Sequence, residues 1–170
     1  MNTGQMLITI SAMVLLSMVI VNVNRNSLTN TANMDKTKYE IMAVSLANTL
    51  INEACSKSFD EASTDSKQIS DVTKLSANLG KDPGELYRKD FDDCDDYNFY
   101  SYNTASDTAI ISADFDVSCR VFYVDPFTSL DSVGSKQYHK RIEVSVTSQF
   151  LNDGQDTVRL SKINSHYYFR

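Results

Sequence analysis

The chain has 170 residues and a net charge of −6, and its 42% hydrophobic and 22% charged residues are ordinary for a globular protein. This length suits one domain with an appendage. The acidic balance argues against nucleic acid as a partner, because phosphate binding needs clustered Lys and Arg that the sequence lacks. The acidity itself is best interpreted as solubility.

The first distinctive element is an apolar segment, residues 6–23, which contains no charged side chain. Its 18 residues span about 27 Å as a helix, close to the hydrocarbon thickness of a bilayer. A cleaved secretory signal fits poorly, because no Lys or Arg precedes the segment and no A-x-A site follows it. A plain membrane anchor remains open, although flanking charges such as Arg25 are too few to orient it.

Gly4 stands just before this segment, separated from it only by Gln5. This arrangement resembles the N-terminus of type IV pilins and of the pseudopilins of type II secretion. In that family a short leader ends in Gly, and a dedicated prepilin peptidase cuts before the hydrophobic helix. The resemblance implies a leader of residues 1–4 and a cut between Gly4 and Gln5. The sequence departs from the family at Thr9, the fifth residue after that cut, where most members have a Glu that is thought to neutralise a neighbour's N-terminal amine.

The apolar segment is predicted to continue as one long helix, because no Pro or Gly occurs between Gln5 and Gly80. Residues 5–25 form its hydrophobic part and residues 26–56 its continuation. Asn is dense in 22–33 and has poor helix propensity, so local unwinding is expected there, as in assembled pilins. The later part is predicted to be amphipathic and to pack on a sheet. Its apolar residues recur at i+3/i+4 spacing: Tyr39, Met42, Ala43, Leu46, Leu50 and Ala54.

Residues 57–107 are predicted to form an irregular connection with a short helical turn at 72–78. Its most unusual feature is a run of four carboxylates in five residues, namely Asp92, Asp93, Asp95 and Asp96. Such a run suits either Ca²⁺ or a solvated turn whose Asp side chains bond backbone N–H groups. The EF-hand pattern is absent, which favours the turn. The segment FDDCDDY, residues 91–97, is similar to the FDDxDDY segment of minor pilins of the mannose-sensitive haemagglutinin type.

Strand patterns fill the last part of the chain, 108–170. Candidate strands are residues 108–113, 115–124, 138–151 and 156–169, and residues 115–124 alternate clearly between apolar and polar side chains. Asn152, Asp153 and Gly154 are a strong turn signal between the last two, which predicts a hairpin. The expected fold is therefore α+β, with a long N-terminal helix packed on an antiparallel sheet of three or four strands. This layout is also that of pilins.

The three cysteines are Cys55, Cys94 and Cys119, so at least one has no intramolecular disulfide partner. Cys94 and Cys119 both lie in the C-terminal half, which leaves a disulfide between them open if that part is outside the cytoplasm. The alternative for each cysteine is a reduced, buried, small apolar side chain, and this alternative is favoured for Cys55. No metal-binding spacing of cysteines is present.

Catalytic motifs are missing, and the two histidines, His139 and His166, lie on predicted strands. The chain is therefore expected to be no enzyme, and no cofactor is expected beyond the Ca²⁺ considered above. Its function is predicted to be structural, because the apolar half of the helix needs lipid or neighbouring helices around it. The resemblance implies a subunit of an extracellular type IV pilus-like filament.

That resemblance also implies the partners and the location. The precursor would lie in the bacterial inner membrane and meet the prepilin peptidase and the pilus assembly machinery. It would then polymerise with copies of itself into a surface filament or a periplasmic pseudopilus. The alternatives are a minor pilin or a secretion pseudopilin that primes assembly, and a single-pass membrane-anchored binding domain. The side chains expected in the filament core are Leu7, Ile8, Thr9, Val14, Leu15, Leu16, Val19 and Ile20.

Overall fold

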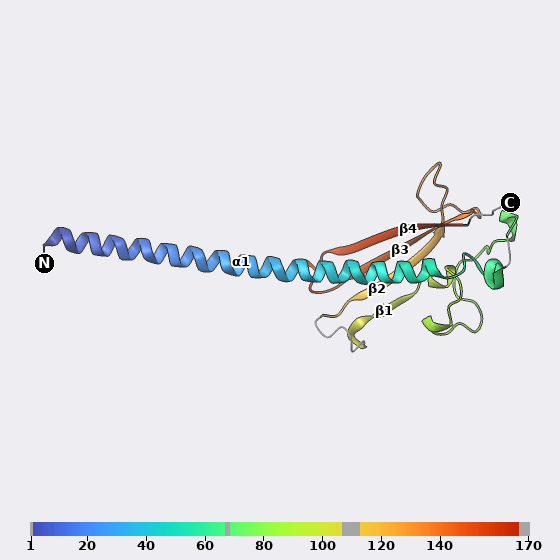
Figure 1. Cartoon of the computed structure of the whole chain (residues 1–170), viewed down its shortest axis with the longest axis horizontal. Coiled ribbons are helices and arrows are strands. Elements are labelled where there is room, and N and C mark those ends of the chain that lie inside the picture. The colour runs from blue at the N-terminus through green and yellow to red at the C-terminus, as the bar shows by residue number, and fades with distance from the viewer. Residues whose placement is uncertain (1, 67–68, 107–112, 167–170) are drawn as a thin grey trace. The chain divides into compact units, whose positions relative to one another are not determined.

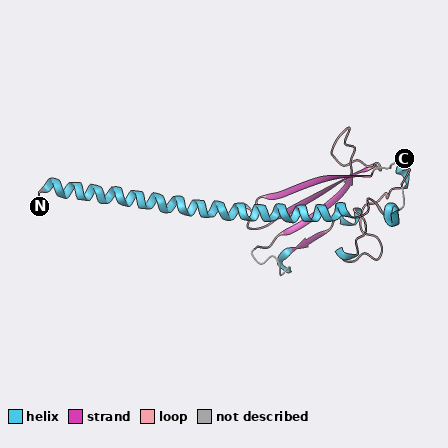
Figure 2. Cartoon of the chain, in the orientation of Figure 1, coloured by secondary structure: helices cyan, strands magenta, loops and turns pink. Residues whose placement is uncertain are grey.

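The computed structural model describes residues 2–66, 69–106 and 113–166 (Figure 1). Its longest element is helix α1, Thr3–Ser56, and the helix is followed by short 3₁₀ turns and an antiparallel sheet (Figure 2). The chain divides into two compact units, Met1–Lys38 and Tyr39–Arg170. Of the predicted leader, residues 1–4, the residues Thr3 and Gly4 lie in the first turn of α1.

Within the first unit, α1 runs without a break through the Asn-rich residues 22–33, so no unwinding is present there. Hydroxyl side chains support the helix by donating to the carbonyl one turn earlier. Ser17 Oγ donates to Met13 O at 2.9 Å, and Thr29 Oγ1 donates to Arg25 O at 3.0 Å. This local pairing satisfies the hydroxyl groups within the helix, both in the apolar segment at Ser17 and beyond it at Thr29.

The remainder of α1 belongs to the second unit and is amphipathic, as the sequence predicted. Ala43, Ala47, Leu50, Ile51 and Ala54 are buried. Tyr39, Met42 and Leu46 are half-buried and pack beside them in the same core. Alanine at three of the five buried positions lets the helix backbone approach the sheet closely.

The described part of the second unit contains a four-stranded antiparallel sheet in the order β1-β2-β3-β4. The strands are β1 Ser101–Asn103, β2 Asp116–Tyr123, β3 His139–Thr147 and β4 Thr157–Ser165. Cys119 of β2 lies opposite Val144 of β3, which lies opposite Leu160 of β4. The α+β prediction, with the helix on an antiparallel sheet, is confirmed.

Three of the predicted strands are present with trimmed ends. The predicted strand at 108–113 lies almost entirely outside the described residues, and β1 instead occupies part of the predicted connection. The β3–β4 hairpin is closed by the 3₁₀ turn Asn152–Gly154, where Asn152, Asp153 and Gly154 all have positive φ. Asn, Asp and Gly are the residues that tolerate this backbone best, so the turn forms where the sequence placed it.

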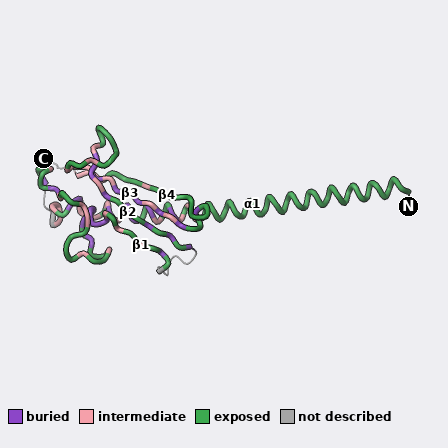
Figure 3. Tube along the Cα trace, turned by 180° about the vertical axis from the view of Figure 1, so that it is seen from behind, coloured by how far each residue is buried: buried purple, intermediate pink, exposed green. Residues whose placement is uncertain are grey.

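The core lies between the buried face of α1 and one face of the sheet (Figure 3). From β2 it receives Val117, Cys119 and Val121, and from β3 it receives Ile142, Val144 and Val146. Phe91 and Tyr97 from the connection close it, and their rings meet edge to face at 5.1 Å. A second, smaller cluster contains Phe59, Ile69, Leu75 and Tyr123. The helical turn predicted at 72–78 is the 3₁₀ turn Val72–Lys74 beside this cluster.

Candidate functional sites: an apolar helix surface and a buried ion cluster

The apolar surface of the first unit is the most prominent candidate site. Every described residue up to Lys38 is exposed. Within residues 6–23, the large apolar side chains are 49–70% exposed and point in all directions around the helix. The part of the chain that the structure describes contains one helix long and apolar enough to cross a membrane, and this segment supplies it.

The side chains predicted for a filament core all belong to this surface. Leu7, Ile8, Val14, Leu15, Leu16, Val19 and Ile20 are between 52% and 70% exposed. Thr9 is also exposed, and its Oγ1 donates to Met6 O at 2.9 Å. The hydroxyl at the position where pilins usually have Glu is therefore paired within its own helix.

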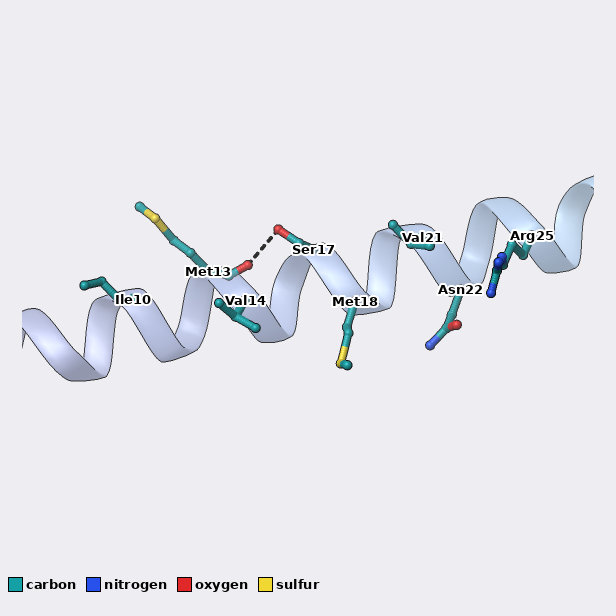
Figure 4. Close-up of a pocket in the computed structure, with 8 residues that line it drawn as sticks. All are labelled: Ile10, Met13, Val14, Ser17, Met18, Val21, Asn22 and Arg25. Carbon is teal, nitrogen blue, oxygen red and sulfur yellow. Dashed lines mark hydrogen bonds between the residues drawn. The ribbon is translucent and has the colours of Figure 1, made fainter.

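One face of this helix is hollowed along several turns (Figure 4). The hollow is lined by Ile10, Met13, Val14, Ser17, Met18, Val21, Asn22 and Arg25. These residues follow one another at i+3/i+4 spacing, so they form a single stripe. The stripe is apolar at its start and ends in an amide and a guanidinium group.

The predicted processing residues lie in the first turn of α1. Gln5 N–H donates to Asn2 O at 2.9 Å. A Cβ added to Gly4 would meet no heavy atom within 4 Å, so the packing of this chain does not require glycine there. Glycine in a helix is about 1 kcal/mol less favourable than alanine, so its presence is unexplained by the helix itself.

The carboxylates of the FDDCDDY segment lie in the second unit and are mostly buried. Asp93 Oδ1 accepts the N–H groups of Asp95 and Asp96 at 2.8 and 3.2 Å. Asp96 Oδ2 accepts the N–H groups of Asp92 and Asp93 at 3.1 and 3.2 Å. The turn-forming interpretation holds, but the expectation that the turn is solvated is wrong, because Asp93, Asp95 and Asp96 are at most 3% exposed.

One partner of these buried carboxylates is a lysine that the sequence analysis missed. Lys140 of β3 is fully buried, and its Nζ donates to Asp60 Oδ1 at 2.7 Å and to Asp95 Oδ1 at 2.9 Å. We call Lys140, Asp60 and Asp95 the ion cluster. The alternation of the strand residues could have predicted that Lys140 is buried. Lys140 has the same parity as Ile142 and Val144, so it had to face the core.

Further groups complete the surroundings of the ion cluster. Lys140 Nζ also donates to Phe59 O at 2.7 Å and lies 4.7 Å from the centre of the Phe59 ring. Asp60 accepts from Ser76 N at 3.0 Å, Ser76 Oγ at 3.1 Å and Ala62 N at 3.3 Å. The Tyr123 hydroxyl donates to Asp60 Oδ1 at 3.3 Å and to Ser76 O at 2.8 Å.

Burial shifts the titration of this region. It lowers the pKa of Lys140, but Asp95 and Asp60 raise it more, so the net shift is upward and Lys140 is an ammonium. Burial raises the pKa of Asp95 against the opposing effect of Lys140. Burial, aided by Asp95, raises the pKa of Asp93 to about 9, so Asp93 is a neutral acid at pH 7. Burial, aided by Glu85, raises the pKa of Asp96 to about 7.

The four carboxylates considered for Ca²⁺ do not converge on one point. Among the described residues, acidic oxygens gather within 4.8 Å in two groups, Glu61 with Asp92 and Asp93, and Glu85 with Asp92 and Asp96. Asp95 belongs to neither group, since its carboxylate binds Lys140. The predicted set of Asp92, Asp93, Asp95 and Asp96 is therefore divided among different partners.

The cysteines are free thiols in the structure. The disulfide left open between Cys94 and Cys119 is not formed, and both thiols are buried in the core. Burial raises the pKa of Cys119 to about 12 and raises that of Cys94 still further. Both therefore stay protonated and act as small apolar side chains.

The connection is tied to α1 by a second polar group. Arg88 forms an ion pair with Glu53 of the helix, and the Tyr97 hydroxyl donates to Glu53 Oε1 at 2.8 Å.

The histidines lie at one end of the sheet. His139 Nδ1 is 2.7 Å from Ser165 Oγ, a contact between directly paired residues of β3 and β4.

A long N-terminal helix with an apolar first part, followed by a helix segment packed on an antiparallel sheet, is a pilin-like architecture. In comparisons with protein families, curated proteins and solved structures, the chain matches none of them.

Proposed function

We propose that this protein is a structural subunit of a type IV pilus-like filament that polymerises through residues 5–25. The observation that carries the proposal is the exposed apolar surface of residues 6–23, whose large side chains are 49–70% exposed. Removing these side chains from water contributes on the order of 10 kcal/mol. Either lipid or neighbouring helices must therefore surround the segment, and a filament subunit uses both in succession.

Two observations favour neighbouring helices as the final surroundings. The stripe from Ile10 to Arg25 has spaces between its side chains into which the side chains of another helix can pack, as helix surfaces do in bundles. Gly4 supports the route to that state. No packing in this chain requires it, and a peptidase that recognises glycine next to the apolar helix accounts for it.

The proposal includes the course of assembly. The precursor is held in the bacterial inner membrane, loses residues 1–4 to a prepilin peptidase, and enters a filament built by a pilus assembly machinery. The filament lies at the cell surface or, for a pseudopilus, in the periplasm. The second unit, Tyr39–Arg170, which we call the sheet unit, would then face the solvent. The acidic net charge of the chain would keep it soluble there.

Polymerisation through the helix can be tested with full-length variants produced in a host that carries a pilus assembly machinery. Leu16→Arg places a charge in the apolar segment, and Leu86→Arg is a matched control at a residue that is 77% exposed in the sheet unit. Shearing followed by electron microscopy should reveal fibres for the wild type and Leu86→Arg but none for Leu16→Arg. Fibres of normal length from Leu16→Arg would contradict polymerisation through this surface.

Processing is tested separately by sequencing the mature N-terminus. The expected first residue is Gln5, and Gly4→Val should leave the precursor uncut, because a branched side chain then replaces the residue before the cut. A wild-type chain that retains residues 1–4 in purified fibres would refute the peptidase route while leaving polymerisation standing.

The single-pass membrane anchor is the second candidate, and the length and apolarity of the segment favour it equally. It predicts that all of the protein stays in the membrane fraction after shearing. A minor pilin or priming pseudopilin differs instead in copy number. Quantitative mass spectrometry of sheared fibres separates these cases, because a major subunit makes up most of the fibre protein and a minor subunit only a small fraction.

A further inference from the structure

The ion cluster places an amine against a carboxyl group in a setting closed to water. Lys140 Nζ lies 2.9 Å from Asp95 Oδ1, and the side-chain exposures are 0% and 4%. The rings of Phe59 and Tyr123 lie 4.7 and 5.5 Å from the same nitrogen. We propose that Lys140 and Asp95 condense within the folded chain, forming an isopeptide bond between Nζ and Cγ with release of one water.

The two carboxylates of the cluster differ in a way that assigns their roles. Asp60 accepts hydrogen bonds from Ser76, Ala62 and Tyr123 in addition to Lys140, and donors of this kind stabilise an anion. Within the described residues, the Asp95 carboxyl has hydrogen bonds to the Lys140 ammonium and to the side chain of Asp93, and no backbone N–H donates to it. Asp60 is therefore held as a carboxylate 2.7 Å from Nζ, where it can receive a proton, and Asp95 is the group that is attacked.

Asp93 is placed to assist as a positioning residue. Its Oδ1 is fixed by the N–H groups of Asp95 and Asp96, so its other oxygen bears the proton that is donated to the Asp95 carboxyl. A donated proton withdraws electrons from Asp95 Cγ and makes it more electrophilic. Two carboxyl groups in different surroundings thus carry different roles, as in other buried acid pairs.

The reaction balances without any further reactant. The Lys140 ammonium passes one proton to Asp60, 2.7 Å away, and the lone pair of Nζ attacks Cγ of Asp95. The Cγ–O bond breaks, and the leaving oxygen takes up that proton from Asp60 and a second proton from Nζ. An ammonium and a carboxylate become one amide and one water, so the net charge of the pair is unchanged. The buried site holds the two groups together and keeps water from reversing the step.

The bond would join β3 to the turn Asp95–Tyr97 across 45 residues of sequence. It would replace two buried charges, which are costly to desolvate, by one neutral amide. It would also lower the conformational entropy of the unfolded chain, as a disulfide does. The thiols Cys94 and Cys119 form no such link in this structure, so the amide would be the covalent closure of this unit.

The test is a tryptic peptide map of the full-length protein after denaturation, read by tandem mass spectrometry. The proposal predicts one branched peptide in which residues 90–120 are joined to residues 137–141, lighter than the two parts by one water. Trypsin does not cut after an amidated lysine, so cleavage after Lys140 should be lost. Separate, unmodified peptides 90–120 and 137–140 from the wild type would overturn the proposal without any variant being needed.

Two variants sharpen the result. Lys140→Arg keeps the positive charge but should give only unbranched peptides. Asp95→Asn should lose ammonia instead of water and arrive at a product of the same mass as the wild-type product. A wild-type branch to residues 58–67 would show that Asp60 is the attacked group and would overturn the assigned roles.

Discussion

Asp93 offers an unusual prediction, because replacing this carboxyl by an amide should stabilise the protein. The neutral acid accepts two backbone N–H groups through Oδ1 and donates to the side-chain oxygen of Asp95, which is an acceptor in the carboxylate and in the amide alike. Asparagine offers the same acceptor and a donor in the same place, so Asp93→Asn preserves the folded state while removing the need to protonate a carboxyl on folding.

The magnitude follows from the two pKa values. The pKa of Asp93 is 3.8 in the unfolded chain and about 9 in the folded chain. Between these values the unfolded chain binds fewer protons, so the free energy of unfolding falls as pH rises. The stability that comes with the neutral form is fully present below pH 3.8 and is lost as pH rises through about 9. At pH 7 the difference amounts to at most about 4 kcal/mol. Asp93→Asn should regain much of it at pH 7 and little near pH 4.

The assay is guanidinium unfolding of the detergent-solubilised chain, followed by tyrosine fluorescence, at pH 4.5, 7 and 8. Asp92→Asn is the control, because Asp92 is the exposed neighbour in the same turn. The wild type should lose stability from pH 4.5 to 8, and Asp93→Asn should show a clearly shallower slope. A variant that is less stable than the wild type at pH 7 would refute the neutral-acid interpretation.

Three further outcomes are expected. Leu50→Ala should lower the free energy of unfolding by about 2–5 kcal/mol, because Leu50 is fully buried under the sheet, whereas Ile41→Ala, at a residue 64% exposed on the same helix, should change it little in thermal unfolding. Iodoacetamide should modify Cys94 and Cys119 only after denaturation, and their modification in the native protein, followed by mass spectrometry, would contradict their burial. Glu53→Gln should reduce stability by about 1 kcal/mol or less, since its ion pair with Arg88 is partly exposed, and the loss should shrink in high salt when unfolding is repeated there.

Local patterns predicted the regular elements well. The i+3/i+4 spacing of the helix placed Ala43, Leu50 and Ala54 in the core, and the alternation of β2 placed Val117, Cys119 and Val121 there. The Asn-Asp-Gly turn predicted the hairpin of β3 and β4. These features depend on neighbours a few residues apart, and sequence spacing reports such neighbours directly.

Long-range pairing explains what was missed. β1 has only three residues and exists because Tyr102 lies opposite Val117 of β2, so no local pattern marked it. The buried Asp95 carboxylate is paired with Lys140, which is 45 residues away in the sequence. The buried Asp60 carboxylate is paired with the same lysine, which is 80 residues away. The sequence analysis therefore expected the run of carboxylates to be solvated. In the structure, pairing with a distant lysine accompanies the burial of Asp95 in that run.

The hydroxyls of Thr9 and Ser17 have a consequence for any change of surroundings. Each is already bonded to a carbonyl of its own helix, so neither hydroxyl needs a hydrogen bond from whatever lies beside it. Passing from lipid to a bundle of protein helices would then leave both of these hydrogen bonds intact. In the proposed filament, the helix would leave the bilayer without either hydroxyl losing its partner, and it would return in the same way if a fibre were taken apart.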